Sequence, residues 1–335
     1  MKRIKCHLIL HSKVKHLNQI FAGFVELNKK GIVELSKENK YDTGKQILEV
    51  IINDNIKVIF DTMDEQEFYA KTVMKIDNID YYFKRSFKSI EASKYNFKSY
   101  PLGLNYNVYS KNGNILDLKE VIKNKLIKII KNYKYNFYPE DFESFSISED
   151  KPKICFLTRV WDTNSKEIEN EDVRKEREEI NNFRVECIKA CKENFKENFI
   201  GGIEDSEFAR KYFSEFITKN TDITKRDKFL NILKETEICI STTGLHKSIG
   251  WKLGEYVAAS RVIVSEPLYY ELPGEFKNGK NYIEFRNADE LIEVLTYLIN
   301  NKEKRQEIMK NNLYYYNNYV KPEMIVLNAL LKVIN

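Results

Sequence analysis

The stretch TTGLHKSIGWKLGEYVAAS, residues 242–260, combines residue types that suggest binding of a phosphorylated ligand. It follows an apolar run, EICIS, that is typical of a strand. A helix beginning near Ser248 or Ile249 would present backbone N–H groups and a partial positive charge, which suits a phosphate. Lys247 and Lys252 add positive charge. The small residues that would let a ligand approach the backbone are Thr243, Gly244, Ser248 and Gly250.

Glu255 lies about two turns into this predicted helix. Its carboxylate could accept hydrogen bonds from the two vicinal hydroxyls of a ribose. The alternative is structural: Ser248 caps the helix, Lys247 is solvated and Glu255 lies on an exposed face. The residues alone favour neither interpretation, because glycine-rich junctions between loops and helices are common.

Strand and helix patterns alternate through both halves of the chain. In the second half, apolar runs at ICFLT, NFIGGI, EICIS and RVIVSE are separated by helical patterns, of which 170–194 is the longest. In the first half, strands are predicted at 4–10, 31–36, 55–64 and 79–87, with helices at 16–30 and 65–75. This alternation indicates parallel sheets with crossover helices, and therefore an α/β fold.

The chain length indicates two domains, since 335 residues exceed what one hydrophobic core usually covers. A helical pattern at 119–134 is followed by a polar, aromatic segment at 135–152, which we interpret as the linker. The predicted domains are 1–148 and 149–312. A helical tail at 313–335, broken near Pro322, completes the chain.

Composition excludes several classes of protein. The net charge of +5 comes from dispersed lysines and glutamates, which argues against nucleic-acid binding. No apolar run is long enough to span a membrane, so we expect a cytoplasmic protein, compatible with association at the inner membrane face. The five cysteines predict buried free thiols in a reducing compartment. The four histidines are not spaced as metal ligands usually are, and no isolated Asp-x-Asp motif lies at the end of a predicted strand. We therefore expect no metal cofactor.

The C-terminal half, residues 152–335, resembles the donor-binding domain of bacterial nucleotide-sugar glycosyltransferases of the GT-B fold, group 1. Glu255 matches the second glutamate of their donor helix. VAAS-RVIVSE matches the small-residue turn and strand that follow, and NGKNYIEF (278–285) matches the next segment. The resemblance is weaker in the N-terminal half, where YFKRSF and SYPLGLNY look like elements of a poorly characterised bacterial branch. It implies two Rossmann-like domains facing each other across a cleft, with the C-terminal helix packed on the N-terminal, acceptor-side domain.

The sequence departs from that family at one position. Counted back over seven intervening residues from Glu255, the family's first glutamate, which contacts the transferred sugar, is replaced by Lys247. The resemblance also implies that Arg159, just after the strand ICFLT, pairs with the donor diphosphate. A guanidinium binds phosphate in a bidentate manner and could neutralise the leaving group without a metal. The alternative for Arg159 is a surface salt bridge with Asp162.

Transfer to an acceptor hydroxyl in an inverting enzyme would require a base from the first domain. Asp61, at the end of the strand KVIFD, is our first candidate, because ligands bind at the carboxyl ends of parallel strands; His11, after the first strand, is the second. Helix capping is the alternative for Asp61, and a surface loop position is the alternative for His11. Lys84 and Arg85 could hold an anionic acceptor or phosphate, or could simply end a strand in solvent.

The sequence therefore predicts a glycosyltransferase that uses a nucleotide-diphosphate sugar and a carbohydrate-type acceptor. That acceptor could be a surface glycan or polysaccharide, a lipid-linked sugar or a glycoprotein. Two alternatives remain open. One is a non-catalytic scaffold that binds nucleotide or glycan, which the lysine at position 247 supports. The other is a nucleotide-sugar epimerase, which would need more acid and histidine groups around the sugar than this sequence offers.

Overall fold

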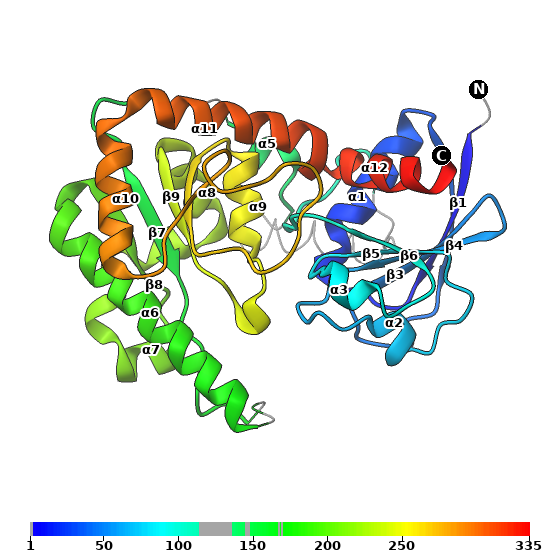
Figure 1. The fold of residues 1–335 in the computed structure, drawn as a ribbon, viewed down its shortest axis with the longest axis horizontal. Coiled ribbons are helices and arrows are strands. Elements are labelled where there is room, and N and C mark those ends of the chain that lie inside the picture. The colour runs from blue at the N-terminus through cyan, green and yellow to red at the C-terminus, as the bar shows by residue number, and fades with distance from the viewer. Residues whose placement is uncertain (1–2, 114–135, 145–147, 167, 169) are drawn as a thin grey trace, which may run out of the picture. The chain divides into compact units, whose positions relative to one another are not determined.

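The chain divides into two α/β units in a computed structural model that describes residues 3–113, 136–144, 148–166, 168 and 170–335. Unit 1 comprises Met1–Glu143, Tyr270–Glu275 and Tyr315–Asn335, and unit 2 comprises Ser144–Tyr269 and Phe276–Tyr314. The predicted helix at 119–134 and parts of the predicted linker lie outside the described residues. Two α/β units with Rossmann-like helix and strand alternation confirm the predicted fold class (Figure 1).

Unit 1 is built on a six-stranded sheet of order β2-β1-β3-β4-β5-β6. Its strands are β1 (Ile4–Leu10), β2 (Val33–Asn39), β3 (Ile47–Ile52), β4 (Ile56–Asp61), β5 (Tyr81–Lys84) and β6 (Lys98–Pro101). Its helices are α1 (Asn18–Lys29), α2 (Tyr69–Thr72), α3 (Ser89–Ala92), α5 (Pro139–Phe142) and α12 (Pro322–Ile334), with a 3₁₀ turn at Lys15–Leu17 and a π-helical turn at Tyr316–Val320.

The sheet of unit 1 is mixed, which corrects the prediction of a parallel sheet. Strand β3 runs antiparallel to both β1 and β4, while the other pairs are parallel. A tight turn joins β3 to β4, in which Asn53 and Asp54 adopt positive φ angles of 50° and 69°. Asn and Asp tolerate this left-handed conformation better than most residues, so the turn is encoded locally.

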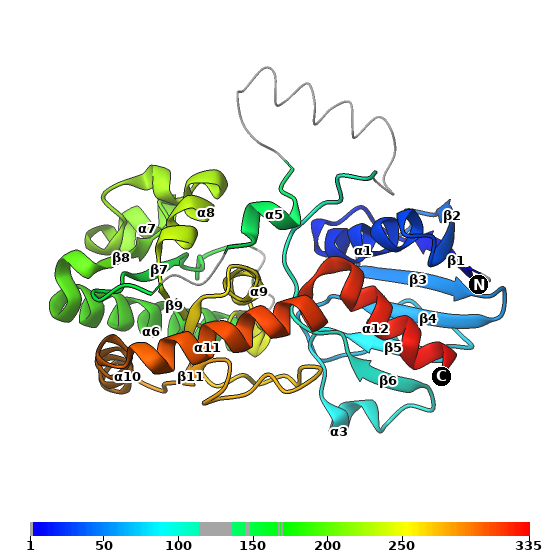
Figure 2. The same cartoon turned by 90° about the horizontal axis from the view of Figure 1, so that it is seen from above.

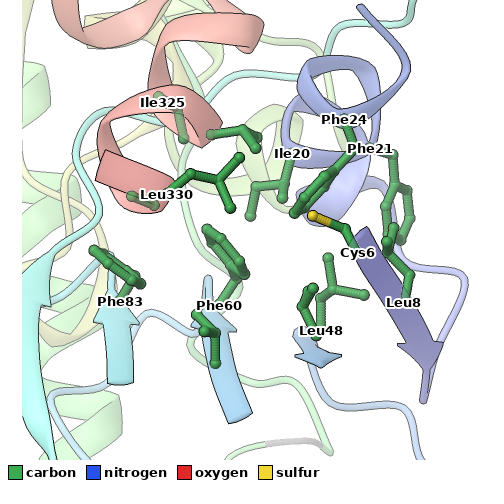
Figure 3. Close-up of a cluster of buried hydrophobic side chains, with 14 of the residues drawn as sticks. Cys6, Leu8, Ile20, Phe21, Phe24, Leu48, Phe60, Phe83, Ile325 and Leu330 are labelled. Atoms are coloured by element: carbon green, nitrogen blue, oxygen red, sulfur yellow. The ribbon is translucent and has the colours of Figure 1, made fainter. Parts of the chain in front are cut away.

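The main core of unit 1 lies between one face of the sheet and the two helices α1 and α12 (Figures 1 and 2). Alternate residues of each strand face these helices, as period-two packing requires. Figure 3 shows Leu8, Leu48 and Phe60 pointing from the strands to the side of the sheet that carries Phe24 of α1 and Leu330 of α12. The C-terminal helix thus packs on the N-terminal unit, as predicted.

A second, smaller cluster covers the opposite face of this sheet. Ile47, Ile59 and Tyr82 point there and pack against Phe68 and Ala92, beside the short helices α2 and α3. The helix that was predicted at 65–75 is only one turn long, at Tyr69–Thr72.

A short segment from the second half of the chain belongs to unit 1. Residues 270–275 lie in sequence between the strands β10 (Val262–Ser265) and β11 (Ile283–Glu284) of unit 2. Yet Glu271 N donates to Phe87 O over 3.0 Å, and Ser89 N donates to the Glu271 carboxylate over 2.8 Å. The hydroxyl of Tyr315 donates to Pro273 O over 2.8 Å. These long-range bonds have no local sequence signal.

Unit 2 is a five-stranded, fully parallel sheet of order β11-β10-β9-β7-β8. Its strands are β7 (Ile154–Thr158), β8 (Phe199–Ile203), β9 (Ile238–Ser241), β10 (Val262–Ser265) and β11 (Ile283–Glu284). Its helices are α6 (Glu171–Phe195), α7 (Glu207–Tyr212), α8 (Arg226–Glu235), α9 (Trp251–Ala258), α10 (Ala288–Asn300) and α11 (Lys302–Tyr315).

The core of unit 2 joins α6, α10 and α11 to the sheet. Cys187, Ile188 and Cys191 of α6 pack with Leu291 and Leu295 of α10 against the strands. All five cysteines are free and buried, as predicted. No helix in the described part of the chain is long and apolar enough to cross a membrane.

Candidate functional site

The carboxyl ends of β7, β9 and β10 bring together most of the predicted donor residues. Because neighbouring parallel strands end at one edge of a sheet, Arg159 after β7 and the loop 242–250 after β9 share that edge of unit 2. The side chain of Arg159 is exposed, and its guanidinium lies 4.0 Å from the ring centroid of Trp161. Stacking on the indole leaves the charge of Arg159 at the surface.

A buried arginine of α6 ties these two loops together. Arg184 donates to the carbonyl of Arg159 over 2.7 Å, to the carbonyl of Thr243 over 2.9 Å and to the hydroxyl of Thr242 over 3.0 Å. Burial lowers the pKa of Arg184 to about 10, so the side chain remains charged at neutral pH. Arg184 therefore acts as a support that fixes the loops after β7 and β9 to one another.

The same face of α6 also holds the loop after β7. The amide of Asn181 accepts from Trp161 N over 2.7 Å and donates to Trp161 O over 2.8 Å. Arg177 donates to Asp162 O over 2.6 Å. Residues 177, 181 and 184 share one helix face at spacings of four and three, and all three are nearly buried.

The loop 242–250 forms a closed turn. Gly244 N donates to Ser248 O over 2.9 Å, and Ser248 N donates to Leu245 O over 3.1 Å. His246 and Lys247 adopt positive φ angles of 58° and 54°, a conformation that costs non-glycine residues energy. A Cβ at Gly244 would lie 2.9 Å from the hydroxyl of Ser248, so glycine fits the turn best.

Two carboxylates from outside the loop hold its backbone. Glu266, directly after β10, accepts from Thr243 N over 2.6 Å, and Glu176 of α6 accepts from His246 N over 2.7 Å. Both N–H groups lie in the loop that precedes the predicted phosphate-binding helix start at Ser248 or Ile249. In this conformation they are already hydrogen-bonded.

Helix α9 begins at Trp251, later than the predicted start at Ser248 or Ile249. Gly250 is its N-cap, while Ser248 and Ile249 are buried residues of the preceding turn. Lys247 is exposed, and its ammonium lies 5.0 Å from the ring centroid of Tyr269. The capping role suggested for Ser248 is therefore wrong.

Glu255 is 1% exposed, in contrast to the exposed position that the structural alternative assumed. Arg226, the first residue of α8, lies 2.7 Å from its Oε1 in an ion pair. Neither Glu255 oxygen accepts a well-formed hydrogen bond from the residues that the structure describes. A buried carboxylate with unused acceptor capacity is costly, and such groups often serve a ligand.

Lys252 lies near this carboxylate, on the first turn of α9. Its ammonium is 3.7 Å from the ring centroid of Phe229, and burial lowers its pKa, although the charge of Glu255 partly offsets the effect. Lys252 is half-buried, so its position is compatible with a local charge-balancing role.

The predicted catalytic base Asp61 is fully buried, at the end of β4. Its carboxylate accepts from the hydroxyl of Tyr82 over 2.5 Å and from Met63 N over 2.9 Å, and lies 3.1 Å from the ammonium of Lys84. Burial and the adjacent Asp61 raise the pKa of Tyr82 well above its usual value, so Tyr82 remains a donor. Asp61 and Lys84 form an internal ion pair, which leaves neither accessible to substrate.

His11 is also occupied by neighbouring groups. Its Nδ1 lies 2.9 Å from Asp42 and its Nε2 lies 3.1 Å from Glu49, and the residue is 4% exposed. Burial alone would lower the pKa of His11, but its hydrogen bonds to the carboxylates of Glu49 and Asp42 outweigh burial and raise the pKa. Because both ring nitrogens contact carboxylates and the side chain is buried, His11 holds Asp42 and Glu49 in place. The suggested surface loop position is therefore wrong, and neither nitrogen is left to act as a base.

Arg85 is 5% exposed and is paired with Asp64 at 2.9 Å. It also donates to Thr62 O over 3.3 Å. The alternative, in which Lys84 and Arg85 simply end a strand in solvent, is wrong for both residues. Their charges are matched inside unit 1.

Sequence reasoning missed four contributors to the edge of unit 2: Arg184, Arg226, Glu176 and Glu266. Glu266 had a usable signal, because it directly follows the strand RVIVS. The other three lie on helices with many charged residues, and only the fold selects them. Within the described ranges, no group of three or more His, Cys, Asp or Glu side chains could hold a metal ion.

Part of this edge, including the loop 242–250, Glu255 and Glu266, lies in a stretch that matches a known family. Residues 183–318 match the family model described as "Glycosyl transferase-like". This match lies inside the region whose resemblance the sequence indicated, and it confirms the similarity to glycosyltransferases there. No curated protein matches the chain.

Several solved structures are similar to this chain at low sequence identity. The C-terminal domain of the group 1 glycosyltransferase LpcC from Francisella tularensis is 13% identical, with a TM-score of 0.35, covering 53% of this chain and 95% of that one. HepE of Anabaena, in complex with UDP, is 11% identical, with a TM-score of 0.42, covering 82% and 71%. TarM is 12% identical, with a TM-score of 0.42, covering 82% and 50%, and the chain thus spans half of its length.

Proposed function

We propose that this protein is a glycosyltransferase that moves a sugar from a nucleotide-diphosphate sugar to a carbohydrate-type acceptor, such as a surface glycan, polysaccharide, lipid-linked sugar or glycoprotein. The main support is Glu255, a buried carboxylate with unused acceptor capacity, in a region that matches glycosyltransferases. A ribose diol supplies the two hydroxyl donors that such a carboxylate lacks. Binding would require the Arg226 side chain to shift from Glu255.

Arg159 is proposed to bind the diphosphate. It is exposed, stacked on Trp161 and fixed through its backbone by Arg184, so its charge is positioned in advance. Lys247, exposed on the adjacent loop, is a second cation for the same group. With two cations for the leaving diphosphate, we propose a metal-independent reaction.

Two observations favour a second candidate, a scaffold that binds nucleotide or glycan without turnover. The position of the family's first glutamate holds Lys247, and both predicted bases, Asp61 and His11, are held in ion pairs. This candidate predicts nucleotide binding at the same edge of unit 2. It differs from the first in predicting no transfer and no hydrolysis of the sugar nucleotide.

A thermal-shift panel of UDP, GDP, CMP, dTDP and ADP, with and without magnesium, tests the proposal. A ligand that binds the native state raises its melting temperature by mass action. We expect one diphosphate to give a selective shift that magnesium does not change and that Arg159→Ala diminishes. The absence of any shift would contradict the glycosyltransferase and the nucleotide-binding scaffold, and would leave only a scaffold that binds glycan. Release of sugar from the matching sugar nucleotide then separates the enzyme from the scaffold.

A further inference from the structure

Glu266 occupies a central place at the carboxyl edge of unit 2. It directly follows β10, and its Oε2 accepts both from Thr243 N, over 2.6 Å, and from the Thr243 hydroxyl, over 3.2 Å. Thr243 belongs to the loop that holds the predicted donor residues. The carboxylate of Glu266 is therefore fixed against the loop to which the donor is proposed to bind.

The second oxygen of this carboxylate remains available. Among the residues that the structure describes, Oε1 of Glu266 has no hydrogen-bond donor, and the side chain is half-buried. Burial raises the pKa of Glu266, and the bonds from Thr243 and the charge of Arg184 only partly offset that effect. Arg184 itself is committed to Arg159, Thr242 and Thr243. The site therefore presents a fixed hydrogen-bond acceptor with spare capacity.

We propose that Glu266 contacts the transferred sugar of the donor by accepting hydrogen bonds from its hydroxyls. This inference rests on the proposed function. The position at which the resemblance places a sugar-contacting glutamate holds Lys247, and Glu266 supplies a carboxylate to the same loop from the adjacent strand. A carboxylate acceptor repels a second carboxylate, so Glu266 selects a neutral sugar with free hydroxyls over a uronic acid.

The test compares the affinity of a nucleotide diphosphate with that of its sugar conjugate, so it needs no acceptor. Calorimetric titrations use UDP, UDP-glucose and UDP-glucuronate, and GDP with GDP-mannose. In the native protein, the neutral sugar nucleotide binds more tightly than the bare diphosphate, and UDP-glucuronate gains nothing. Glu266→Gln is expected to reduce the gain from the sugar by about tenfold, the size of one charged hydrogen bond, and to leave the diphosphate affinity unchanged.

Glu176→Gln is the matched control. Glu176 also accepts a backbone N–H of this loop, that of His246, but it comes from α6. We expect Glu176→Gln to affect the bare diphosphate and the sugar nucleotide equally, if at all. If Glu266→Gln behaves in the same way, Glu266 merely holds the loop and the proposal is wrong.

The outcomes also separate this inference from the proposed function. If no diphosphate binds the native protein, the proposed function fails and this inference fails with it. Only the role of Glu266 is overturned if diphosphates bind but neither glucose nor mannose adds affinity. The same holds if Glu266→Gln keeps the full gain in affinity from the neutral sugar. Equal binding of UDP-glucose and UDP-glucuronate by the native protein would also contradict it.

Discussion

Charged residues at the carboxyl ends of the strands differ in burial and pairing between the two units. In unit 1, the charges at the strand ends are buried and matched, as in the pair of Asp61 and Lys84 and the clamp of His11 by two carboxylates. In unit 2, Arg159 is exposed and Glu266 is half-buried with one oxygen available. A charged residue at a strand end is therefore not sufficient evidence of a site, because its partners decide whether it can reach a ligand.

The largest effect is expected from breaking the internal pair of unit 1. Asp61→Asn leaves the ammonium of Lys84 buried without an opposite charge, which should lower the free energy of unfolding by about 3–5 kcal/mol. Urea denaturation, monitored by hydrogen exchange at β4 and β5, measures the free energy of unfolding of unit 1. A double variant, Asp61→Asn with Lys84→Met, should recover part of the loss. An Asp61→Asn protein of normal stability that has lost transfer would restore Asp61 as the base.

The next effect concerns the buried carboxylate of unit 2. Glu255→Gln removes the charge proposed to bind the ribose and should weaken diphosphate binding by about 1.5–3 kcal/mol. Calorimetric titration measures the change, and 2′-deoxy nucleotides should show a smaller difference between the variant and native proteins. Arg226→Gln is the control for the ion pair with Glu255. Unchanged affinity in Glu255→Gln would remove Glu255 from the proposed site.

The clamp around His11 predicts a pH dependence of stability. Because the folded pKa of His11 is raised above its ordinary value of 6.5, its contribution is fully present below that value and is lost as pH rises through the folded pKa. The pKa of Glu49 is lowered below its ordinary value of 4.5, chiefly by its hydrogen bond with His11. Its contribution is present above that value and is lost as pH falls through the folded pKa.

Melting of unit 1 measured against pH tests this account of His11. Stability should be greatest between pH 4.5 and pH 6.5, the ordinary pKa values of the Glu49 and His11 side chains. The variant His11→Gln should flatten the alkaline side of the profile. Lys5→Gln, which removes an exposed pair with Asp54, is the control and should leave the shape unchanged. An alkaline limb that persists in His11→Gln would show that another group titrates.

The smallest effect is expected at the turn between α9 and β10, where the resemblance places a small residue. Ser260 has a φ angle of 56°, is fully buried, and its hydroxyl has no hydrogen-bond partner among the described residues. Ser260→Gly should therefore raise stability by about 1 kcal/mol, because glycine adopts this conformation without strain. Ser260→Ala removes the unpaired hydroxyl but keeps the backbone strain, so it separates these two contributions to stability. A destabilised Ser260→Gly protein would contradict this account.

Unit 2 could be predicted from the sequence more fully than unit 1, for physical reasons. Its strands, such as ICFLT, are buried parallel strands that appear as continuous apolar runs separated by helices. In unit 1, the strand ILEVII was missed, together with its antiparallel pairing. The turn residues Asn53 and Asp54 were the signal that could have revealed it.

The sequence predicted the kind of site and the strand ends that carry it, but not the side chains that hold these strand ends in place. Arg159 and the loop at 242–250 were placed at one edge, because parallel strand ends meet there. The positions of Arg226 and Arg184 depend on how α8 and α6 pack, which helical periodicity does not determine. The segment at 270–275 belongs to unit 1 through bonds to residues almost 200 positions away, such as that of Ser89 to Glu271 (a sequence separation of 182).

Hydrogen exchange of the intact protein, measured with and without saturating UDP, GDP or dTDP in turn, tests most directly the claim that unit 2 holds the ligand site. One nucleotide is predicted to slow exchange in the loop 242–250, in α9 up to Glu255 and around Arg159. The strand ends at Asp61 and Lys84 should exchange at the same rate with and without it. Protection confined to those strand ends of unit 1, or no protection with any of the three, would contradict the account.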